Sequence, residues 1–247
     1  MTFIAGKTIL VTGANRGIGR ALVEEALGRG AKRVYAGTRR PLAHSDERVT
    51  PLTLDVTDSD QVKHAADQIE SLDVLVNNAG VASYDDLSDP EAIERHLAVN
   101  LFGTHRVTQA FLPLLTRSGG AIVNNLSVNA LAPFPVIPAY SISKAAAFSM
   151  TQSLRALLAG SGVRVHAVLT GIVDTEMSEA VDAPKASPEL VAQGIFDGVE
   201  KDEDDIFPDP MAETLTASWR GGAVKELERQ NAAFAMAIIT QTEGAAS

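Results

Sequence analysis

The sequence predicts one α/β domain built on a parallel β-sheet. The chain has 247 residues, of which 45% are hydrophobic and 21% are charged, and this length can bury one large core. Short apolar runs, typical of strands covered on both faces, alternate with longer segments of helical periodicity. The first such run, at residues 8–11, leads through a glycine-rich loop into a helical pattern. Since no linker separates two halves, we expect a single domain over residues 1–247.

The composition excludes several classes of function. The formal net charge of −10 argues against an extended surface for nucleic acid or anionic lipid. The chain has no cysteine, which excludes disulfides and thiolate chemistry, and its five histidines lack metal-ligand spacing. There is neither a run of about 18 apolar residues nor a signal-peptide pattern. We therefore expect no bound metal, no membrane span and, by default, a cytoplasmic location.

A glycine-rich loop at residues 12–19 follows the first predicted strand directly. Glycines at 13, 17 and 19 allow a tight turn and a close approach of the backbone to a ligand. The helix that follows offers free N–H groups and a positive dipole end to a pyrophosphate. This pattern indicates a dinucleotide site, with expected contacts from Gly13, Asn15, Arg16, Gly17, Ile18 and Gly19.

The second strand, at residues 33–38, indicates which dinucleotide is bound. An acidic residue near its end would hold the ribose 2′-hydroxyl of NAD, whereas a 2′-phosphate needs cations. This chain has Thr38 and then Arg39-Arg40, and Arg16 lies in the glycine loop. The pattern favours NADP(H), although an isolated basic pair such as Arg39-Arg40 is also typical of a solvated loop.

Two further strands end in residues suited to a cofactor. The run at residues 49–54 leads to Asp55-Val56, where the aspartate either accepts the adenine amino group or only caps a turn. The run at residues 74–76 opens into Asn77-Asn78-Ala79-Gly80. Small and amide side chains at that point suit a floor beneath a cofactor ring.

The remaining polar candidates follow apolar segments. Asn100 interrupts the helical pattern of residues 90–115 and predicts a kink or a bound water. Ser127 follows the fifth strand, at residues 121–126, and so lies at the carboxyl edge of the sheet where ligands bind. Tyr140 and Lys144 are four residues apart, hence on one face of a helix, where the ammonium would lower the pKa of the phenol. By itself, this last pair also fits an ordinary amphipathic helix.

Together these residues resemble the classical short-chain dehydrogenases/reductases over about residues 6–176. The resemblance rests on Thr12-Gly-x-x-x-Gly17-x-Gly19, Asn77-Asn-Ala-Gly80, Asn100, Ser127 and Tyr140-x-x-x-Lys144. It implies a doubly wound Rossmann-type domain with a seven-stranded parallel sheet in the order 3-2-1-4-5-6-7, helices on both faces, and a homotetramer or homodimer.

The resemblance also implies roles for single residues. Tyr140 would be the general acid, Ser127 would hydrogen-bond the substrate carbonyl, Lys144 would lower the phenol pKa and hold the nicotinamide ribose, and Asn100 would position a water. The chain departs from the family where Thr170-Gly171 replaces the usual Pro-Gly after the sixth strand, at residues 162–169. Cofactor contacts are expected from Gly171, Ile172 and Thr175, while the role of Thr170 stays open.

The rest of the chain completes this prediction. Residues 175–187 fit a substrate lid, Ser187-Pro188 starts a helix, and residues 206–208 form a last strand. A polar, alanine-rich tail occupies about residues 225–247, in which residues 236–239 either contact another subunit or fray.

These features predict an NADPH-dependent reductase of an uncharged, fairly apolar ketone or aldehyde, a small molecule. The expected substrate contacts are Ser127, Val128, Asn129, Phe134, Ile137, Tyr140 and Met177. Two alternatives are a halohydrin dehalogenase, whose family resembles this one but has Arg in place of Lys144 and no glycine loop, and a non-catalytic NADP-sensing regulator, which would often lack the tyrosine.

Overall fold

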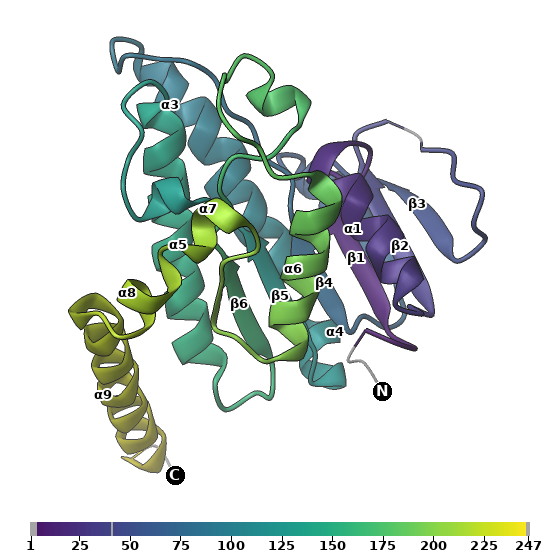
Figure 1. Cartoon of the computed structure of the whole chain (residues 1–247). Coiled ribbons are helices and arrows are strands. Elements are labelled where there is room, and N and C mark those ends of the chain that lie inside the picture. The colour runs from purple at the N-terminus through teal and green to yellow at the C-terminus, as the bar shows by residue number, and fades with distance from the viewer. Residues whose placement is uncertain (1–3, 41, 246–247) are drawn as a thin grey trace.

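A single parallel β-sheet organises the structure, a computed structural model that describes residues 4–40 and 42–245, with side chains described as far as residue 235. Its seven strands lie in the order β3-β2-β1-β4-β5-β6-β7, and all neighbouring pairs are parallel (Figure 1). The predicted doubly wound fold and strand order are confirmed. The strands are β1 Thr8–Thr12, β2 Arg33–Thr38, β3 Val49–Thr53, β4 Val74–Asn77, β5 Ala121–Asn125, β6 Arg164–Val168 and β7 Asp205–Ile206.

Helices cover both faces of this sheet. One hydrophobic core joins β1 to α1 (Gly17–Gly28) and α6 (Pro188–Glu200). A second core on the other face contains residues of α2 (Ser59–Asp67), α4 (Thr104–Ser118) and α5 (Pro138–Leu158). Each central strand is fully buried, which explains why the sequence of these strands is continuously apolar rather than alternating.

The long helical pattern of residues 90–115 is interrupted where Asn100 predicts a kink. It forms α3 (Pro90–Leu97), then a π-helical turn at Ala98–Gly103, then α4. Asn100 lies inside the π-helical turn, so the α-helical pattern is interrupted at this residue, while the kink itself stays a prediction. The π-helical turn packs closely against the segment that follows β3, because a Cβ added to Gly103 would be 2.7 Å from Val56 Cγ2.

Helix starts and the last strand follow local chemistry. The Ser187 hydroxyl accepts a hydrogen bond from Leu190 N at 3.1 Å, and Pro188 takes the first helical position of α6, as predicted. The last strand is shorter than expected and sits earlier, at β7, because Pro208 has no N–H for a strand ladder.

The chain after β7 forms three helices at the carboxyl edge and beyond it. These are α7 (Pro210–Glu213), α8 (Thr216–Arg220) and α9 (Ala223–Ala245), and α9 projects away from the sheet (Figure 1). The predicted tail is therefore helical as far as residue 245. The side chains of residues 236–239, a predicted subunit contact, lie outside the described part of the chain. Among described helices, none is long and apolar enough to cross a membrane.

Candidate active site

Ser127, Tyr140 and Lys144 come together at the carboxyl edge of the sheet. Ser127 follows β5, and its hydroxyl lies close enough to that of Tyr140 to lower the pKa of the phenol. Tyr140 and Lys144 lie one turn apart on α5, with Lys144 Nζ 5.6 Å from the centroid of the Tyr140 ring. The prediction that Tyr140 and Lys144 share one helix face is confirmed. The hydroxyl groups of Ser127 and Tyr140 and the ammonium of Lys144 therefore lie close together.

Burial shifts the pKa values of this group. Burial raises the pKa of Tyr140 to about 12, against a smaller lowering by the hydrogen bond with Ser127. Burial also lowers the pKa of Lys144 to about 8. The predicted net lowering of the Tyr140 pKa is therefore wrong for the ligand-free protein, where desolvation outweighs the effects that lower it. At neutral pH the phenol keeps its proton, which is the form needed in a general acid.

Lys144 and Asn100 are both held by the backbone around them. Lys144 Nζ donates to the carbonyl oxygen of Asn125 at 2.8 Å. The Asn100 amide donates to Val81 O at 3.0 Å and to Ser143 Oγ at 2.9 Å, and its Oδ1 accepts from Val81 N at 2.9 Å. The Asn100 side chain thus fixes the segment after Gly80 to α5, while the water implied by the family resemblance stays a prediction.

A chain of buried hydrogen bonds crosses the carboxyl ends of the central strands and gives Thr170 a role. Thr170 Oγ1 donates to Asn125 Oδ1 at 2.8 Å, and Asn125 Nδ2 donates to Asn78 Oδ1 at 3.0 Å. Asn78 Nδ2 in turn donates to the carbonyl oxygen of Thr12 at 3.0 Å. Sequence reasoning missed Asn125, whose side chain joins Thr170 to the glycine loop while its carbonyl holds Lys144.

The glycine loop forms a cradle that only glycines permit. Gly13 and Gly17 have φ values of +66° and +50°. A Cβ on Gly19 would overlap the carbonyl oxygen of Gly13 and lie 2.6 Å from Asn78 Nδ2. The N-cap residue of α1, Arg16, makes no side-chain cap, so the first helical N–H groups remain available to an anion. The cradle fits the pyrophosphate of a dinucleotide.

Residues predicted to contact the adenosine half lie along the same edge, several of them with protein partners. Arg16 forms an exposed ion pair with Glu176 in the predicted lid. The Thr38 hydroxyl, buried at the end of β2, donates to the carbonyl oxygen of Arg40, whereas Arg39 is exposed. Asp55 Oδ1 accepts from both Thr57 N and Thr57 Oγ1, which is the turn-capping role. A contact of Asp55 with adenine stays a prediction.

The nicotinamide side of the edge is less completely defined. Val56 is buried beside the π-helical turn, and Ala79 N donates to Thr12 Oγ1 at 3.0 Å. Gly171 N donates to Asp209 Oδ2 at 2.7 Å, which fixes the turn after β6 to the start of α7. Thr175 lies against the glycine loop, because a Cβ added to Gly17 would be only 3.0 Å from Thr175 Cγ2. Ile18 packs against the hydrophobic core that contains α1, and Ile172 O accepts from Ala186 N at 2.9 Å. Contacts of Asn15, Ile18 and Ile172 with a cofactor stay predictions.

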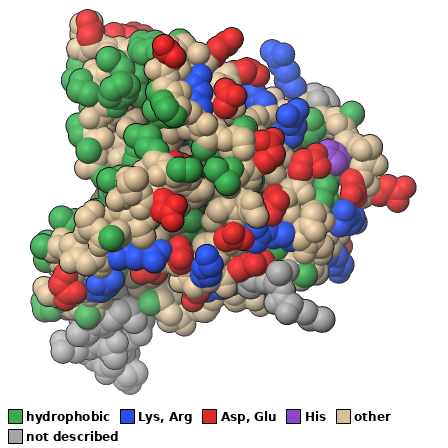
Figure 2. Space-filling model, in the orientation of Figure 1, with side chains coloured by type: hydrophobic (Ala, Val, Ile, Leu, Met, Phe, Trp, Pro, Cys, Tyr) green, Lys and Arg blue, Asp and Glu red, His purple; other side chains and the backbone are tan. Residues whose placement is uncertain are grey.

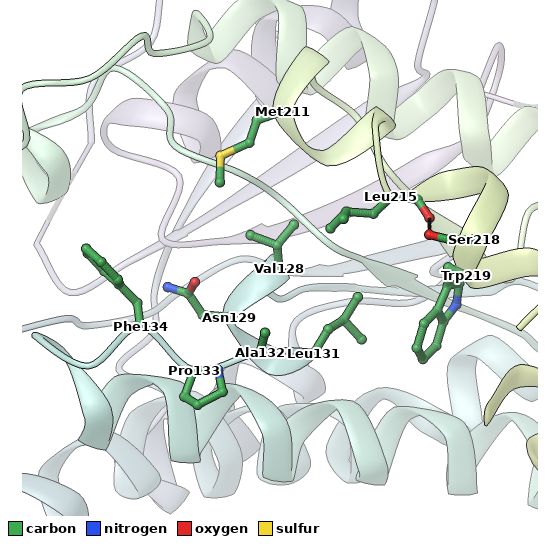
Figure 3. A pocket seen from close by; sticks show the side chains of 10 residues that line it. All are labelled: Val128, Asn129, Leu131, Ala132, Pro133, Phe134, Met211, Leu215, Ser218 and Trp219. Atoms are coloured by element: carbon green, nitrogen blue, oxygen red, sulfur yellow. Dashed lines mark hydrogen bonds between the residues drawn. The ribbon is translucent and has the colours of Figure 1, made fainter. Parts of the chain in front are cut away.

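An apolar pocket of about 440 Å³ is lined by Val128 and Asn129, the two residues that follow Ser127 in the chain (Figure 3). Of the predicted substrate contacts, Val128, Asn129 and Phe134 line it, whereas Ser127, Ile137, Tyr140 and Met177 are not among its lining residues. Met177 lies 53% exposed in the lid segment. Sequence reasoning missed the opposite wall, which comes from the chain after β7: Met211, Leu215 and Trp219. Hydrophobic side chains gather around this part of the surface, whereas charged ones dominate the side of β2 and β3 (Figure 2).

The family model for short chain dehydrogenases matches residues 7–186, well over half of the chain. This protein is a short chain dehydrogenase. The match contains the glycine loop, Asn100, Ser127, Tyr140 and Lys144, so it covers the whole candidate site apart from the pocket wall after β7.

Individual relatives agree with the family. An uncharacterized oxidoreductase of Staphylococcus epidermidis is 35% identical over 211 residues, covering 81% of this chain and 91% of that protein. A short chain dehydrogenase of Burkholderia cenocepacia, crystallised in complex with NADP, is 38% identical, with a TM-score of 0.85 over 93% of this chain and 98% of that one. A ligand-free aldohexose dehydrogenase of Thermoplasma acidophilum is 27% identical, with a TM-score of 0.73 over 83% and 92%. The protein is accordingly an oxidoreductase.

Proposed function

We propose that this short chain dehydrogenase uses NADP(H) to reduce an uncharged, fairly apolar ketone or aldehyde to an alcohol, and catalyses the reverse oxidation. One arrangement supports this most. Ser127, Tyr140 and Lys144 lie together on the sheet edge that also holds the glycine cradle, and the two residues that follow Ser127 line an apolar pocket. Such a site can hold a carbonyl group against a nicotinamide ring.

Several features favour NADP(H) over NAD(H). The end of β2 supplies an exposed Arg39 and no acidic residue, and Arg16 lies in the glycine loop. The NADP complex of the Burkholderia cenocepacia relative supports the same choice. The tight approach of Gly19 to Gly13 favours a dinucleotide over the halide site of a dehalogenase.

The proposed chemistry follows from the protonation states of the site. Bound NADPH supplies the hydride. Tyr140 donates its proton to the carbonyl oxygen, and the Ser127 hydroxyl hydrogen-bonds that oxygen where negative charge develops. Since the Tyr140 pKa is about 12, the phenol is protonated at neutral pH. The nearby ammonium of Lys144, with a pKa of about 8, stabilises the phenolate that remains after proton transfer.

The experiment that tests this proposal follows NADPH absorbance with a panel of neutral ketones, aldehydes and keto acids, and repeats it with NADH. We expect oxidation of NADPH with neutral carbonyl compounds and poor turnover of keto acids. Equal turnover of keto acids would contradict an uncharged substrate. No oxidation with any carbonyl compound would favour the dehalogenase or sensor alternative instead.

We also propose a single-domain protein that acts in the cytoplasm as a homodimer or homotetramer. The one continuous sheet supports a single domain. The family resemblance supports the homodimer or homotetramer. Light scattering on the eluting peak of a size-exclusion column measures the subunit number, and a monomer would contradict it.

A further inference from the structure

Trp219 forms one end of the pocket beside the catalytic residues. In Figure 3, Phe134 and Met211 lie at one end, Leu131 and Trp219 lie at the other, and Val128 lies between them. The volume of about 440 Å³ is within the range of small-molecule sites. Val128 and Asn129 directly follow Ser127 in the chain, so the pocket is the nearest apolar space for a substituent of a molecule whose carbonyl group sits at Ser127.

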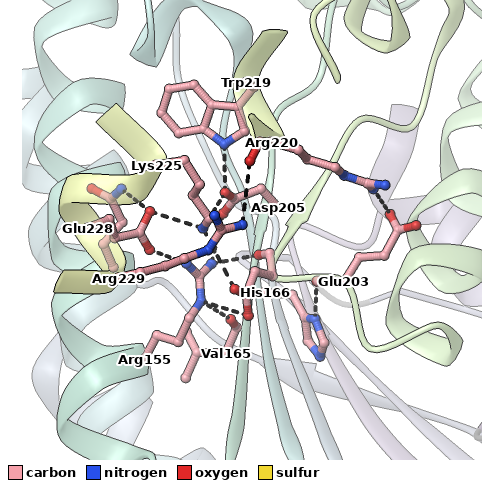
Figure 4. Close-up of polar contacts among 12 residues, drawn as sticks. Arg155, Val165, His166, Glu203, Asp205, Trp219, Arg220, Lys225, Glu228 and Arg229 are labelled. Atoms are coloured by element: carbon pink, nitrogen blue, oxygen red, sulfur yellow. Dashed lines mark hydrogen bonds and ion pairs between the residues drawn. The ribbon is translucent and has the colours of Figure 1, made fainter. Parts of the chain in front are cut away.

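The indole ring of Trp219 is fixed from two sides. Its Nε1–H donates to Asp205 Oδ2 at 2.7 Å (Figure 4). Its ring packs against Phe148 of α5 with 5.6 Å between centroids. Nε1–H is the only hydrogen-bonding group of a tryptophan side chain. Because Asp205 uses that group, Trp219 can offer the pocket only an apolar aromatic surface.

The acceptor Asp205 is itself held in place as an anion. Burial would raise the pKa of Asp205, but Arg155 and Lys225, with hydrogen bonds from Lys225 and Trp219, lower it below its usual value. Arg155 lies 2.9 Å and Lys225 lies 2.7 Å from the carboxylate, and both also contact Glu228 of α9 (Figure 4). The ion cluster joins α5, β7, α8 and α9, and so holds the indole in one position before any ligand binds.

These contacts decide which substituent the pocket fits. Among the described residues that line it, none is charged, and the only polar ones are Asn129 and Ser218. The charges of Arg155, Lys225 and Asp205 are paired with one another behind the indole ring. A carboxylate or phosphate would find no charged partner among these lining residues, whereas a flat apolar ring would find an aromatic surface in a fixed position.

We propose that Trp219 determines substrate specificity by selecting carbonyl compounds that carry an aromatic ring next to the carbonyl group. This inference rests on the proposed function and adds the substrate class. Trp219 contacts the non-reacting part of the substrate, so it acts on the preference between substrates rather than on proton transfer.

Kinetics with two ketones test this proposal. We compare kcat/KM for acetophenone and for 2-butanone in the wild type, Trp219→Ala, Trp219→Phe and Phe234→Ala. Phe234 is a matched control because its aromatic ring is 69% exposed on α9, away from the pocket. We expect Trp219→Ala to lower the acetophenone to 2-butanone ratio about 10-fold or more, while Trp219→Phe and the control stay within about 3-fold.

Two results in these assays would overturn the proposal. One is an unchanged ratio in Trp219→Ala, and the other is an equal loss in Trp219→Phe, which retains an aromatic surface. If Trp219→Ala does not fold, Leu215→Ala decides instead, because Leu215 lines the pocket beside the indole but is 36% exposed. We expect that variant to lower the ratio about 3-fold, and no change would overturn the proposal.

Fluorescence tests the site without turnover, since Trp219 is the chain's single tryptophan. We titrate acetophenone, and separately 2-butanone, into the protein with NADP⁺ present. Saturable quenching by acetophenone, and far weaker saturation by 2-butanone, supports the proposal. Quenching that is not saturable overturns it. If neither ketone is reduced but the quenching saturates, the proposed function fails while the aromatic site stands, so the two failures can be told apart.

Discussion

Replacing Thr170 by valine removes one buried hydroxyl at nearly constant shape. The Thr170 side chain is 4% exposed, and its hydroxyl donates to Asn125 Oδ1 at 2.8 Å. Leaving a buried acceptor without its donor costs about 1–3 kcal/mol. We take about 2 kcal/mol as the expected loss, which corresponds to a decrease in Tm of roughly 4–8 °C for a domain of this length.

The assay is urea denaturation at pH 7, followed by circular dichroism at one fixed protein concentration because assembly changes apparent stability. The matched control is Thr53→Val, which changes an exposed threonine on β3 and should alter the unfolding free energy by less than about 0.5 kcal/mol. A double-mutant cycle with Asn125→Ala isolates the pair, and we expect a coupling energy of about 1–2 kcal/mol.

The same variant should also affect the cofactor site. The Asn125 carbonyl holds Lys144 Nζ, and the Asn125 amide holds Asn78. We therefore expect Thr170→Val to raise the Kd for NADPH by about 3-fold to 10-fold, equivalent to roughly 1 kcal/mol. A variant as stable as the wild type, with no coupling to Asn125, would refute the stabilising role of the Thr170 hydrogen bond to Asn125.

Three further predictions follow from the site. Tyr140→Phe should keep NADPH affinity within about 2-fold but lower kcat roughly 10²–10⁴-fold, and an active variant would contradict the acid role. Arg39→Asp with Arg16→Ala should weaken NADPH binding about 10–100-fold and shift preference to NADH; unchanged selectivity would place 2′-phosphate recognition elsewhere. Burial lowers the Lys144 pKa to about 8 in the folded protein, whereas in the unfolded chain Lys144 titrates near its ordinary pKa of 10.5. Between these two pH values the unfolded chain therefore binds more protons than the folded protein. The stability of the wild type relative to Lys144→Met should therefore rise by up to about 3 kcal/mol from pH 8 to about pH 10.5, and a pH-independent difference would contradict that burial.

Local sequence patterns determined most of the fold and pointed to the groups proposed to react. The apolar strands, the glycine spacing and the Ser187-Pro188 helix start were predictable because strand burial, positive φ and capping depend on residues close in the chain. The spacing of Tyr140 and Lys144 likewise placed both on one helix face.

Only the tertiary structure decided how those groups are tuned and what surrounds them. The sequence suggested that Lys144 lowers the Tyr140 pKa, but burial raises it, because desolvation depends on everything packed around the phenol. It also left Thr170 without a role and Trp219 unassigned. Thr170 meets Asn125, 45 residues earlier, and Trp219 meets Phe148 and Asp205. Contacts between residues so far apart in the chain leave no periodic pattern in the sequence. The sequence by itself therefore determined the sheet and pointed to the side chains proposed to react. The packing of distant segments decided the protonation of these side chains and the position of the pocket wall.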